Sequence, residues 1–464
     1  MTLWTSDQAV AATGGTTTQD WVAHGVSIDT RIIQPGDLFV ALKSQRDGHD
    51  YVANALQAGA AAAVVTHRPN DVAEDAPLLI VSDVLDGLVA LGQAARDRTD
   101  AKILAITGSV GKTSTKEMLR TVLERQGRTH ASVASYNNHW GVPLTLARMP
   151  ADTEFGVFEV GMNHPGEIGP LSEQVRPHVG MITTIAEAHM AAFESLAGIA
   201  REKGDIVSGL QPGGAAVLPA DVDTIDILVE KARAAGATIL GFGEKAEAFK
   251  LIEAKLSDDA TIVRMSMRSQ PAMFKLSTPG KHFAANALGV LAAIEALGGD
   301  PGKAAIDLAL WSPPGGRGKS QDVILDPATD AKFRLIDDAY NANPTSMGAS
   351  LEILAASTPD GKGRRIAILG DMLELGQQEQ SLHAGMAGHP AMSGVDTVLC
   401  VGPRMKALFD VLPADQKGAW ADKAEDLIPQ LANFVRSSDI ILVKGSLGSY
   451  VSRVAAALKK LGER

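Results

Sequence analysis

The chain has 464 residues, with 54 acidic and 43 basic side chains and a formal net charge of −11. An acidic surface disfavours a nucleic-acid backbone or an anionic membrane as a partner, although local basic groups can still bind a small anion. No apolar run is long enough to span a bilayer, and the only cysteine, Cys400, excludes an intramolecular disulfide. The N-terminal sequence shows no secretory pattern. We therefore expect a cytoplasmic protein, monomeric by default, with no nucleic-acid partner and no membrane insertion.

Residues 1–97 are predicted to form a first α/β domain. GDLFVAL (36–42) has the apolar pattern of a strand, and DYVANALQAGA (50–60) has that of a helix. Two further strands, AAAVVTH and PLLIVSD, precede a helix that ends near Arg98. The polar stretch RDRTDAK then predicts a linker to the next domain.

Residues 98–311 are predicted to form a central domain of the phosphate-loop ATPase type. Strand patterns in KILAIT, FGVFEV, HVGMITTI and AAVLPA alternate with the helical stretches STKEMLRTVLERQ and SLAGIAREKGDIVSGL. This alternation predicts a mainly parallel sheet with crossover helices. The domain closes with the helical pattern HFAANALGVLAAIEALGG.

Residues 312–464 are predicted to form a Rossmann-like third domain, after the Pro- and Gly-rich stretch WSPPGGRGKS. FRLID, RIAILGD, DTVLCVG and DIILVKG have strand patterns, and helical patterns lie between them and after the last one. No G-x-G-x-x-G follows the first strand, so we predict no nicotinamide site there. The expected fold class is α/β, with three domains. Cys400 lies within a predicted strand and is expected to be core packing.

The stretch ITGSVGKTSTKEM (106–118) lies between a predicted strand and a predicted helix, which is the context that a phosphate-binding loop requires. The general motif places its first glycine at Ile106, whereas the nearest glycine here is Gly108, so the loop departs from the commonest form. Lys112 is predicted to reach the outer phosphates, and the Thr113 hydroxyl to bind Mg²⁺. The alternative is a glycine-rich turn that binds nothing. The residues predicted to bind ATP in this loop are Gly108, Ser109, Val110, Gly111, Lys112, Thr113 and Ser114.

Other candidate site residues are ambiguous in the sequence alone. Glu159 ends an apolar strand pattern, where metal and nucleotide ligands collect in open α/β sheets, but it also fits a solvated strand end. His189 follows another strand and could be structural, and Lys203 could be a solvated helix residue. Asn137 and Asn138 could be turn residues.

These stretches together resemble the Mur ligase family along essentially the whole chain. SIDTR, GDLFVAL and DGHDYVANALQAGA match the family's uridine-nucleotide domain. TGSVGKTSTKEM, YNNHWGVPLTL, FEVGMNHPGEIG, AHM and AREKGDI match its centre, and IDDAYNANPTSM, LGDMLELG and VKGS match its last domain. The loop form G-x-x-G-K-T is the family's own and is shared with folylpolyglutamate synthases. DAYNANP and LGDMLELG resemble the branch that adds D-alanyl-D-alanine.

The resemblance implies ATP-dependent ligation of D-alanyl-D-alanine to UDP-N-acetylmuramoyl-tripeptide through an acyl phosphate. The products would be UDP-N-acetylmuramoyl-pentapeptide, ADP and phosphate, in peptidoglycan precursor synthesis. It also implies two Mg²⁺ ions and a lysine carbamylated by CO₂. One alternative is another ATP-dependent carboxylate–amine ligase, such as one that adds glutamate to a folate. Another is a nucleotide switch, which predicts an N-K-x-D motif that the sequence lacks.

Residue by residue, the resemblance implies four groups of site residues. Those expected to be catalytic are Lys112, Glu159, His189 and Lys203. Those expected to bind metal are Thr113, Glu159, His189 and, as its carbamate, Lys203. Beyond the loop, Asn286 is expected to face adenine, and Arg317 and Asp338 to hold phosphate and ribose. Expected substrate contacts are Asp29 and Arg31 for the uridine nucleotide, Asn137 and Asn138 for the muramoyl peptide, and Asn341, Asn343 and Lys444 for the peptide ends. His139, Trp140 and Ala191 depart from the pattern of many relatives.

Overall fold

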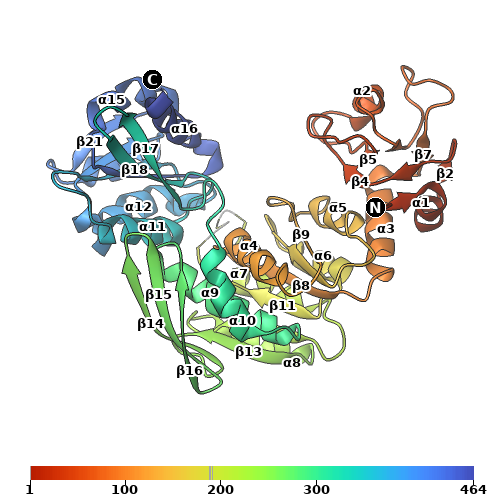
Figure 1. Ribbon diagram of the computed structural model, residues 1–464, viewed down its shortest axis with the longest axis horizontal. Helices are drawn as coiled ribbons and strands as arrows, with labels where there is room; N and C mark the ends of the chain where they lie inside the picture. Colours follow the sequence, from red (N-terminus) through yellow and green to blue (C-terminus); the bar gives the residue numbers. More distant parts are fainter. Residues whose placement is uncertain (1, 188–189, 191, 464) are drawn as a thin grey trace.

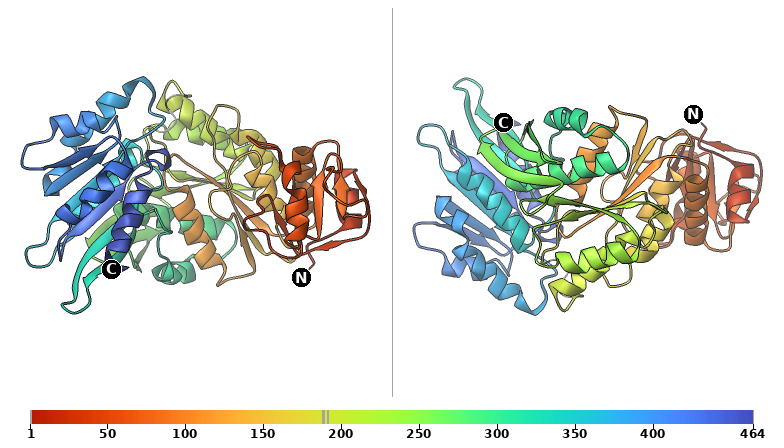
Figure 2. Two further views of the ribbon diagram at one scale, coloured as in Figure 1. Left: turned by 90° about the horizontal axis from the view of Figure 1, so that it is seen from above. Right: turned by 90° about the horizontal axis from the view of Figure 1, so that it is seen from below.

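The protein is described by a computed structural model that covers residues 2–187, 190 and 192–463. Three α/β units follow one another along an elongated molecule. The N-terminal sheet lies at one end, the largest sheet lies in the middle, and the C-terminal sheet lies at the other end (Figures 1 and 2). The predicted α/β class, with mostly parallel sheets, is confirmed. The domain boundaries at 97/98 and 311/312 remain a prediction.

The N-terminal unit is a five-stranded sheet with its helices. The strand order is β2-β7-β6-β5-β4, and only β2 runs antiparallel to its neighbour. Its strands are β2 (Thr16–Thr17), β4 (Gly25–Ser27), β5 (Asp37–Val40), β6 (Ala62–Val65) and β7 (Leu78–Ile80), and β1 (Trp4–Thr5) pairs with β3 (Val22–Ala23) in a separate ribbon. The helices are α1 (Ser6–Thr13), α2 (Val52–Gln57) and α3 (Val84–Asp97).

Helix α3 joins this unit to the centre of the molecule. Its buried Leu88 and Leu91 share one apolar cluster with Leu144 of α5 (Gly141–Ala147). The Arg148 Nε donates a hydrogen bond of 2.6 Å to the Val26 carbonyl across the same junction. The N-terminal unit thus packs against α5. The segment that carries Asn137 and Asn138 lies directly before this helix in the sequence.

The central unit is a nine-stranded sheet in the order β16-β15-β14-β13-β12-β11-β8-β10-β9, with β8 between β11 and β10. The predicted parallel strands are present, and an antiparallel extension, β14 to β16, that we did not predict continues one edge. The strands are β8 (Lys102–Thr107), β9 (Thr129–Ala131), β10 (Phe155–Glu159), β11 (Val179–Ile182), β12 (Ala215–Pro219), β13 (Thr238–Gly243), β14 (Phe249–Ser257), β15 (Ala260–Met267) and β16 (Gln270–Leu276).

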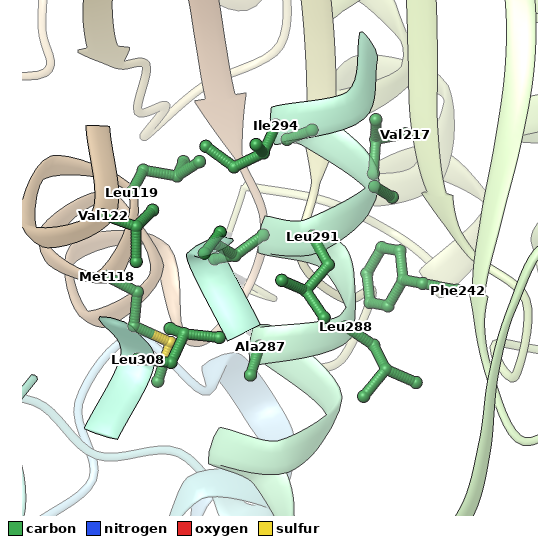
Figure 3. Close-up of a cluster of buried hydrophobic side chains, with 14 of the residues drawn as sticks. Met118, Leu119, Val122, Val217, Phe242, Ala287, Leu288, Leu291, Ile294 and Leu308 are labelled. Carbon is green, nitrogen blue, oxygen red and sulfur yellow. The ribbon is translucent and has the colours of Figure 1, made fainter. Parts of the chain in front are cut away.

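Helices cover both faces of this sheet. On one face α4 packs beside α9, and their apolar side chains meet those of β12 and β13 in one cluster (Figure 3). A second cluster on the other face includes side chains from α5 to α8. The central helices besides α5 are α4 (Lys112–Leu123), α6 (Ile168–Val175), α7 (Leu196–Gly204), α8 (Ile225–Ala234), α9 (Lys281–Ala296) and α10 (Pro301–Asp307).

The C-terminal unit is a six-stranded sheet in the order β17-β18-β22-β19-β20-β21, in which only β17 is antiparallel. Its strands are β17 (Lys319–Asp326), β18 (Ala331–Asp338), β19 (Arg365–Gly370), β20 (Thr397–Val401), β21 (Lys417–Ala421) and β22 (Ile440–Lys444). Its helices are α11 (Pro344–Ala356), α12 (Glu379–Gly385), α13 (Lys406–Val411), α14 (Ala424–Leu427), α15 (Leu431–Phe434) and α16 (Ser452–Lys460). Cys400 is buried in β20, as predicted, and burial raises the pKa of its thiol to about 12. In the part of the chain that is described, no helix is long and apolar enough to cross a membrane.

The packing of α9 leads to a first prediction. Leu291 is 1% exposed within the cluster of Figure 3, so Leu291→Ala should lower the free energy of unfolding by about 2–5 kcal/mol. Ile306, which is 75% exposed, is the matched control, and Ile306→Ala should leave stability almost unchanged. Thermal unfolding of both variants checks this, and equal shifts in the melting midpoint would contradict the packing described.

Candidate active site

A cavity of about 680 Å³ lies between the central and C-terminal sheets. The carboxyl ends of β8, β10 and β11 face it on one side, and the ends of β18 and β22 face it on the other. Most of the predicted site residues therefore meet in one place, although they come from distant parts of the sequence. The predicted residues that line the cavity are Ser109, Val110, Gly111, Lys112, Thr113, Ser114, Asn137, Asn138, Glu159, Asn286, Arg317, Asp338, Asn341, Asn343 and Lys444.

The phosphate loop connects β8 to α4 and requires both of its glycines. Gly108 has φ +150°, and a Cβ there would lie 1.9 Å from the Thr183 hydroxyl. Gly111 has φ +88°, and a Cβ there would lie 2.8 Å from Asn286 Nδ2. No described side chain caps the start of α4, so the first N–H groups of that helix are available to an anion. The turn is thus built for close backbone approach to phosphate.

Lys112 is the first residue of α4, and its Nζ donates a hydrogen bond of 2.6 Å to the Gly108 carbonyl. Burial lowers the pKa of Lys112; the carboxylate of Glu159 opposes this shift, and the guanidinium of Arg317 adds to it. The ammonium of Lys112 therefore lies over the loop, close enough to Glu159 and Arg317 for their charges to affect its pKa.

The oxygen atoms around Glu159 fit a Mg²⁺ ion. Thr113 Oγ1 donates to Glu159 Oε2 at 3.0 Å, and it lies 3.3 Å from the Ser135 hydroxyl. Asn137 Nδ2 donates to Glu159 Oε1 at 2.8 Å, which holds the carboxylate toward the loop. A hydroxyl and a carboxylate are hard oxygen ligands, which is the donor set that Mg²⁺ prefers beside phosphate.

The second predicted metal position is only partly described. His189 and Ala191 lie outside the described residues. Within the described ranges, no group of three or more His, Cys, Asp and Glu side chains could hold a metal ion. Among the described residues, Thr113 and Glu159 are the predicted metal ligands that contact each other.

Lys203 on α7 is buried, at 1% exposure, and does not itself line the cavity. Its ammonium has no hydrogen-bond partner among the residues that the structure describes. Burial lowers the pKa of Lys203 well below its ordinary value, the charge of Lys112 adds to this, and Glu202 opposes it. The Glu202 carboxylate accepts hydrogen bonds from the Gly166 and Ile168 amides, at 2.7 and 2.8 Å. At a given pH, a larger fraction of Lys203 is therefore in the neutral amine form than of a solvated lysine.

On the C-terminal side, Asp338 and Lys444 are neighbours because β18 and β22 pair in parallel register. Lys444 Nζ donates to Asp338 Oδ2 at 2.6 Å and to the Asn341 carbonyl at 3.1 Å. The Ser350 hydroxyl also donates to Asp338 Oδ2, at 2.5 Å. Both of these side-chain hydrogen bonds to Asp338 use Oδ2. Neither occupies Oδ1, so Oδ1 can accept a hydrogen bond from a ligand hydroxyl.

Arg317 bridges the two sides of the cavity. Its Nη2 donates to the Ser135 hydroxyl of the central unit at 3.1 Å, and its guanidinium lies 4.2 Å from the centre of the Tyr340 ring. Stacking on an aromatic ring favours an arginine over a lysine at this position. A guanidinium held here can meet an anion that lies between the two sheets.

Several predicted asparagines have local backbone partners. Asn343 caps α11 by accepting from the Ser346 amide at 2.8 Å, and Asn138 accepts from the Gly141 amide at 2.9 Å. Asn341 accepts from the Ala342 amide at 2.9 Å. Asn286 packs against Gly111 of the phosphate loop. Their turn and cap roles are real, and their side chains also line the cavity.

Asp29 and Arg31 are the predicted residues of the N-terminal unit, and they lie apart from those of the other two units. They follow β4 in the N-terminal unit and do not line the cavity. Arg31 forms an ion pair of 2.5 Å with Asp29, and its side chain is 87% exposed. Any ligand that contacts both this pair and the cavity must therefore be long.

The cavity is also lined by residues that were missed in the sequence, among them Ser135, His282 and Tyr340. Burial lowers the pKa of His282 to about 4, Asp338 opposes this shift, and Lys444 adds to it. His282 is therefore neutral at pH 7. A signal was present, because His282 precedes Asn286 by one turn of α9, Tyr340 is next to Asn341, and Ser135 lies two positions before Asn137.

The fold defines an α/β protein with a loop of the phosphate-binding type, and its cavity lies between two sheets. Three family models match the chain in succession: "Mur ligase family, catalytic domain" over residues 22–103, "Mur ligase middle domain" over 106–294, and "Mur ligase, glutamate ligase domain" over 327–447. These ranges include the phosphate loop, Glu159 and the Asp338 to Lys444 side of the cavity.

Full-length relatives agree with the family models. The UDP-N-acetylmuramoyl-tripeptide–D-alanyl-D-alanine ligase of Rickettsia prowazekii is 33% identical, over 97% of this chain and 99% of the relative. The same ligase of Escherichia coli is 34% identical, over 96% and 95%. A crystal structure of MurF from Acinetobacter baumannii has a TM-score of 0.84 at 30% identity, over 98% of this chain and 99% of that one. The chain belongs to the Mur ligase family.

The geometry of the loop leads to a second prediction. Gly108→Ala should weaken ADP binding by at least about tenfold, because the new methyl group collides with Thr183 and shifts the loop. Gly385 of α12 has open space around it and is the matched control. Isothermal titration of both variants with ADP checks this. Equal ADP affinity in Gly108→Ala and Gly385→Ala would contradict the assignment of the loop.

Proposed function

We propose that this chain joins D-alanyl-D-alanine to UDP-N-acetylmuramoyl-tripeptide with hydrolysis of ATP to ADP and phosphate, in peptidoglycan precursor synthesis. The observation that carries the proposal is the single cavity in which the phosphate loop and Glu159 face the segment of Asp338, Asn341 and Asn343. The full-length similarity to ligases of that name supports the choice of substrates.

The first proposed step activates a carboxylate. A carboxylate oxygen of the tripeptide attacks the γ-phosphorus of ATP, the bond to the β–γ bridging oxygen breaks, and ADP leaves. The product is an acyl phosphate. Both reactants are anions, so positioning and neutralisation of charge supply most of the catalysis. Lys112 and the loop amides would hold the phosphates from one side, and Arg317 would meet them from the other.

Thr113 and Glu159 would hold a Mg²⁺ ion, because their oxygens converge beside the loop. When bound, the ion would neutralise phosphate charge. Asn137 keeps the Glu159 carboxylate turned toward the loop. Asn286, against Gly111, would border the base, and Asp338 would accept hydrogen bonds from ribose hydroxyls.

The second proposed step forms the amide. The amine of D-alanyl-D-alanine attacks the acyl carbon, a proton leaves the nitrogen, and the tetrahedral intermediate expels phosphate. Asn138, Asn341, Asn343 and Lys444 line the cavity where the two peptide ends would meet.

Asp29 and Arg31 would contact the uridine nucleotide on the first of three domains. The proposed domains are residues 1–97, 98–311 and 312–464. We propose that the chain acts in the cytoplasm, where ATP and the nucleotide-linked substrate occur, and that it is a monomer.

A carbamate on Lys203 is a further part of the proposal. The neutral amine would attack CO₂ and lose a proton, which converts a buried cation into an anion near Lys112. The burial of Lys203 and the lack of a described hydrogen-bond partner support this chemistry. With His189, the carbamate would complete a second metal position.

A direct assay tests the function. Purified protein receives ATP, Mg²⁺, D-alanyl-D-alanine and either the diaminopimelate or the lysine form of UDP-N-acetylmuramoyl-tripeptide. We expect ADP release that depends on both substrates and a product with the mass of the pentapeptide. Glu159→Gln should lower kcat/KM by about a hundredfold or more, through loss of the metal site. Absence of pentapeptide with both tripeptides would refute the proposal.

The carbamate has its own test. Lys203→Ala should lose most activity, and formate should restore part of it by supplying a carboxylate in the space that is left. Arg201→Ala, on the exposed side of the same helix, should keep its activity and show no response to formate. A ¹³C carbamate signal after addition of labelled bicarbonate should appear in the wild type and be missing in Lys203→Ala. An undiminished rate in Lys203→Ala would end this part of the proposal.

A further inference from the structure

Lys116 carries a buried charge that the proposed reaction does not use. It lies on α4 with 0% exposure, and its side chain points beneath the segment that follows β9. Its Nζ donates to the Ser132 carbonyl at 2.6 Å and to the Ala134 carbonyl at 2.8 Å, and it lies 2.8 Å from Glu117 Oε1. An ammonium has three N–H donors, so these three acceptors satisfy it completely.

The two carbonyls belong to a segment with an unusual backbone. Ala134 has φ +51°, in the left-handed region that residues other than glycine rarely adopt. Lys116 binds the carbonyl of Ala134 itself and that of Ser132 two residues earlier. An apolar side chain of the same size would leave both carbonyls without this partner. The two hydrogen bonds from the ammonium therefore stabilise a backbone conformation that is unfavourable for an alanine.

The same segment carries the groups that orient the metal ligands. The Ser132 hydroxyl accepts from the Glu159 amide at 3.1 Å, and Asn137 holds the Glu159 carboxylate. Ser135 lies beside the Thr113 hydroxyl. Lys116 follows Thr113 by three positions, so both side chains leave α4 on the same face. One helix thus supplies a metal ligand and also fixes the segment that orients its partner ligand.

The charge of Lys116 is balanced next to it. Burial alone would raise the pKa of Glu117, but the hydrogen bonds and charges of Lys116 and Arg120 outweigh burial and lower it. Glu117 therefore stays ionised beside the buried ammonium. Lys116 is paired with Glu117 and not with Glu159, so the Glu159 carboxylate remains available to the metal.

We propose that Lys116 is a positioning residue for the metal–nucleotide site. By holding residues 132–137 it sets the orientation of the Glu159 and Thr113 oxygens, and thereby the affinity for Mg²⁺-bound nucleotide. This inference rests on the proposed nucleotide site, but it does not depend on which amine or carboxylate is ligated.

The test compares two affinities in Lys116→Met, which keeps the length of the side chain and removes the charge. Isothermal titration is carried out with ADP in excess Mg²⁺ and with ADP in EDTA. We expect the Kd of Mg²⁺-bound ADP to rise by about tenfold or more, as when other groups that orient metal ligands are removed. The Kd of metal-free ADP should stay the same, because the phosphate loop is unchanged.

Leu119→Ala is the matched control, because Leu119 is also fully buried on α4 but packs in the apolar cluster. It should lower the melting temperature and leave both Kd values unchanged. Equal changes, or no change, in the two Kd values of Lys116→Met would overturn the inference. If Lys116→Met does not fold, the same comparison is made in Lys116→Leu, which also removes both donated hydrogen bonds, and the same outcomes overturn the inference.

Failure of the proposed function is distinguishable from failure of this inference. A wild-type chain that binds Mg²⁺-bound ADP and makes no pentapeptide would refute the function and leave the affinity comparison valid. A wild-type chain whose ADP affinity does not depend on Mg²⁺ would overturn the role of Lys116, whatever product it makes.

Discussion

The hydrogen bond from the Thr113 hydroxyl to Glu159 fixes the relation between the phosphate loop and the neighbouring strand. It forms because β8 and β10 pair in parallel, with Glu159 in register with Ile106, directly before the loop. Loop amides, Lys112 and two hard oxygens thereby converge on one end of the sheet. A site for two reacting anions needs this concentration of cations and donors, and the remaining features of the cavity are arranged around it.

The C-terminal sheet completes the site by the same rule. Asp338 and Lys444 are partners in register on neighbouring parallel strands, so their side chains meet at the carboxyl edge that faces the phosphate loop. Arg317 spans the space between the sheets through Ser135 and Tyr340. The N-terminal unit stands apart, seated on α5 (Figure 1), which suits a long substrate that is held at one end and reacts at the other.

The sequence predicted local features better than contacts between distant segments. The phosphate loop, its strand and its helix could be predicted because the glycines, Lys112 and Thr113 are adjacent in the chain. The ion pair of Asp338 and Lys444 joins residues 106 positions apart and depends on the strand order, which no local pattern contains. Strands β14 to β16 were missed, and in β14 the side chains alternate between buried and exposed only imperfectly. The contacts of Lys116 depend on the left-handed backbone at Ala134, where the residue type gives no signal.

The central claim is that the site transfers a phosphoryl group to a substrate carboxylate before the amide forms. The most direct measurement uses tripeptide substrate labelled with ¹⁸O in its terminal carboxylate, together with ATP and D-alanyl-D-alanine, and determines the mass of the released phosphate. The account predicts that one ¹⁸O atom moves from the carboxylate to phosphate in each turnover. Phosphate without the label, released while pentapeptide forms, would contradict it.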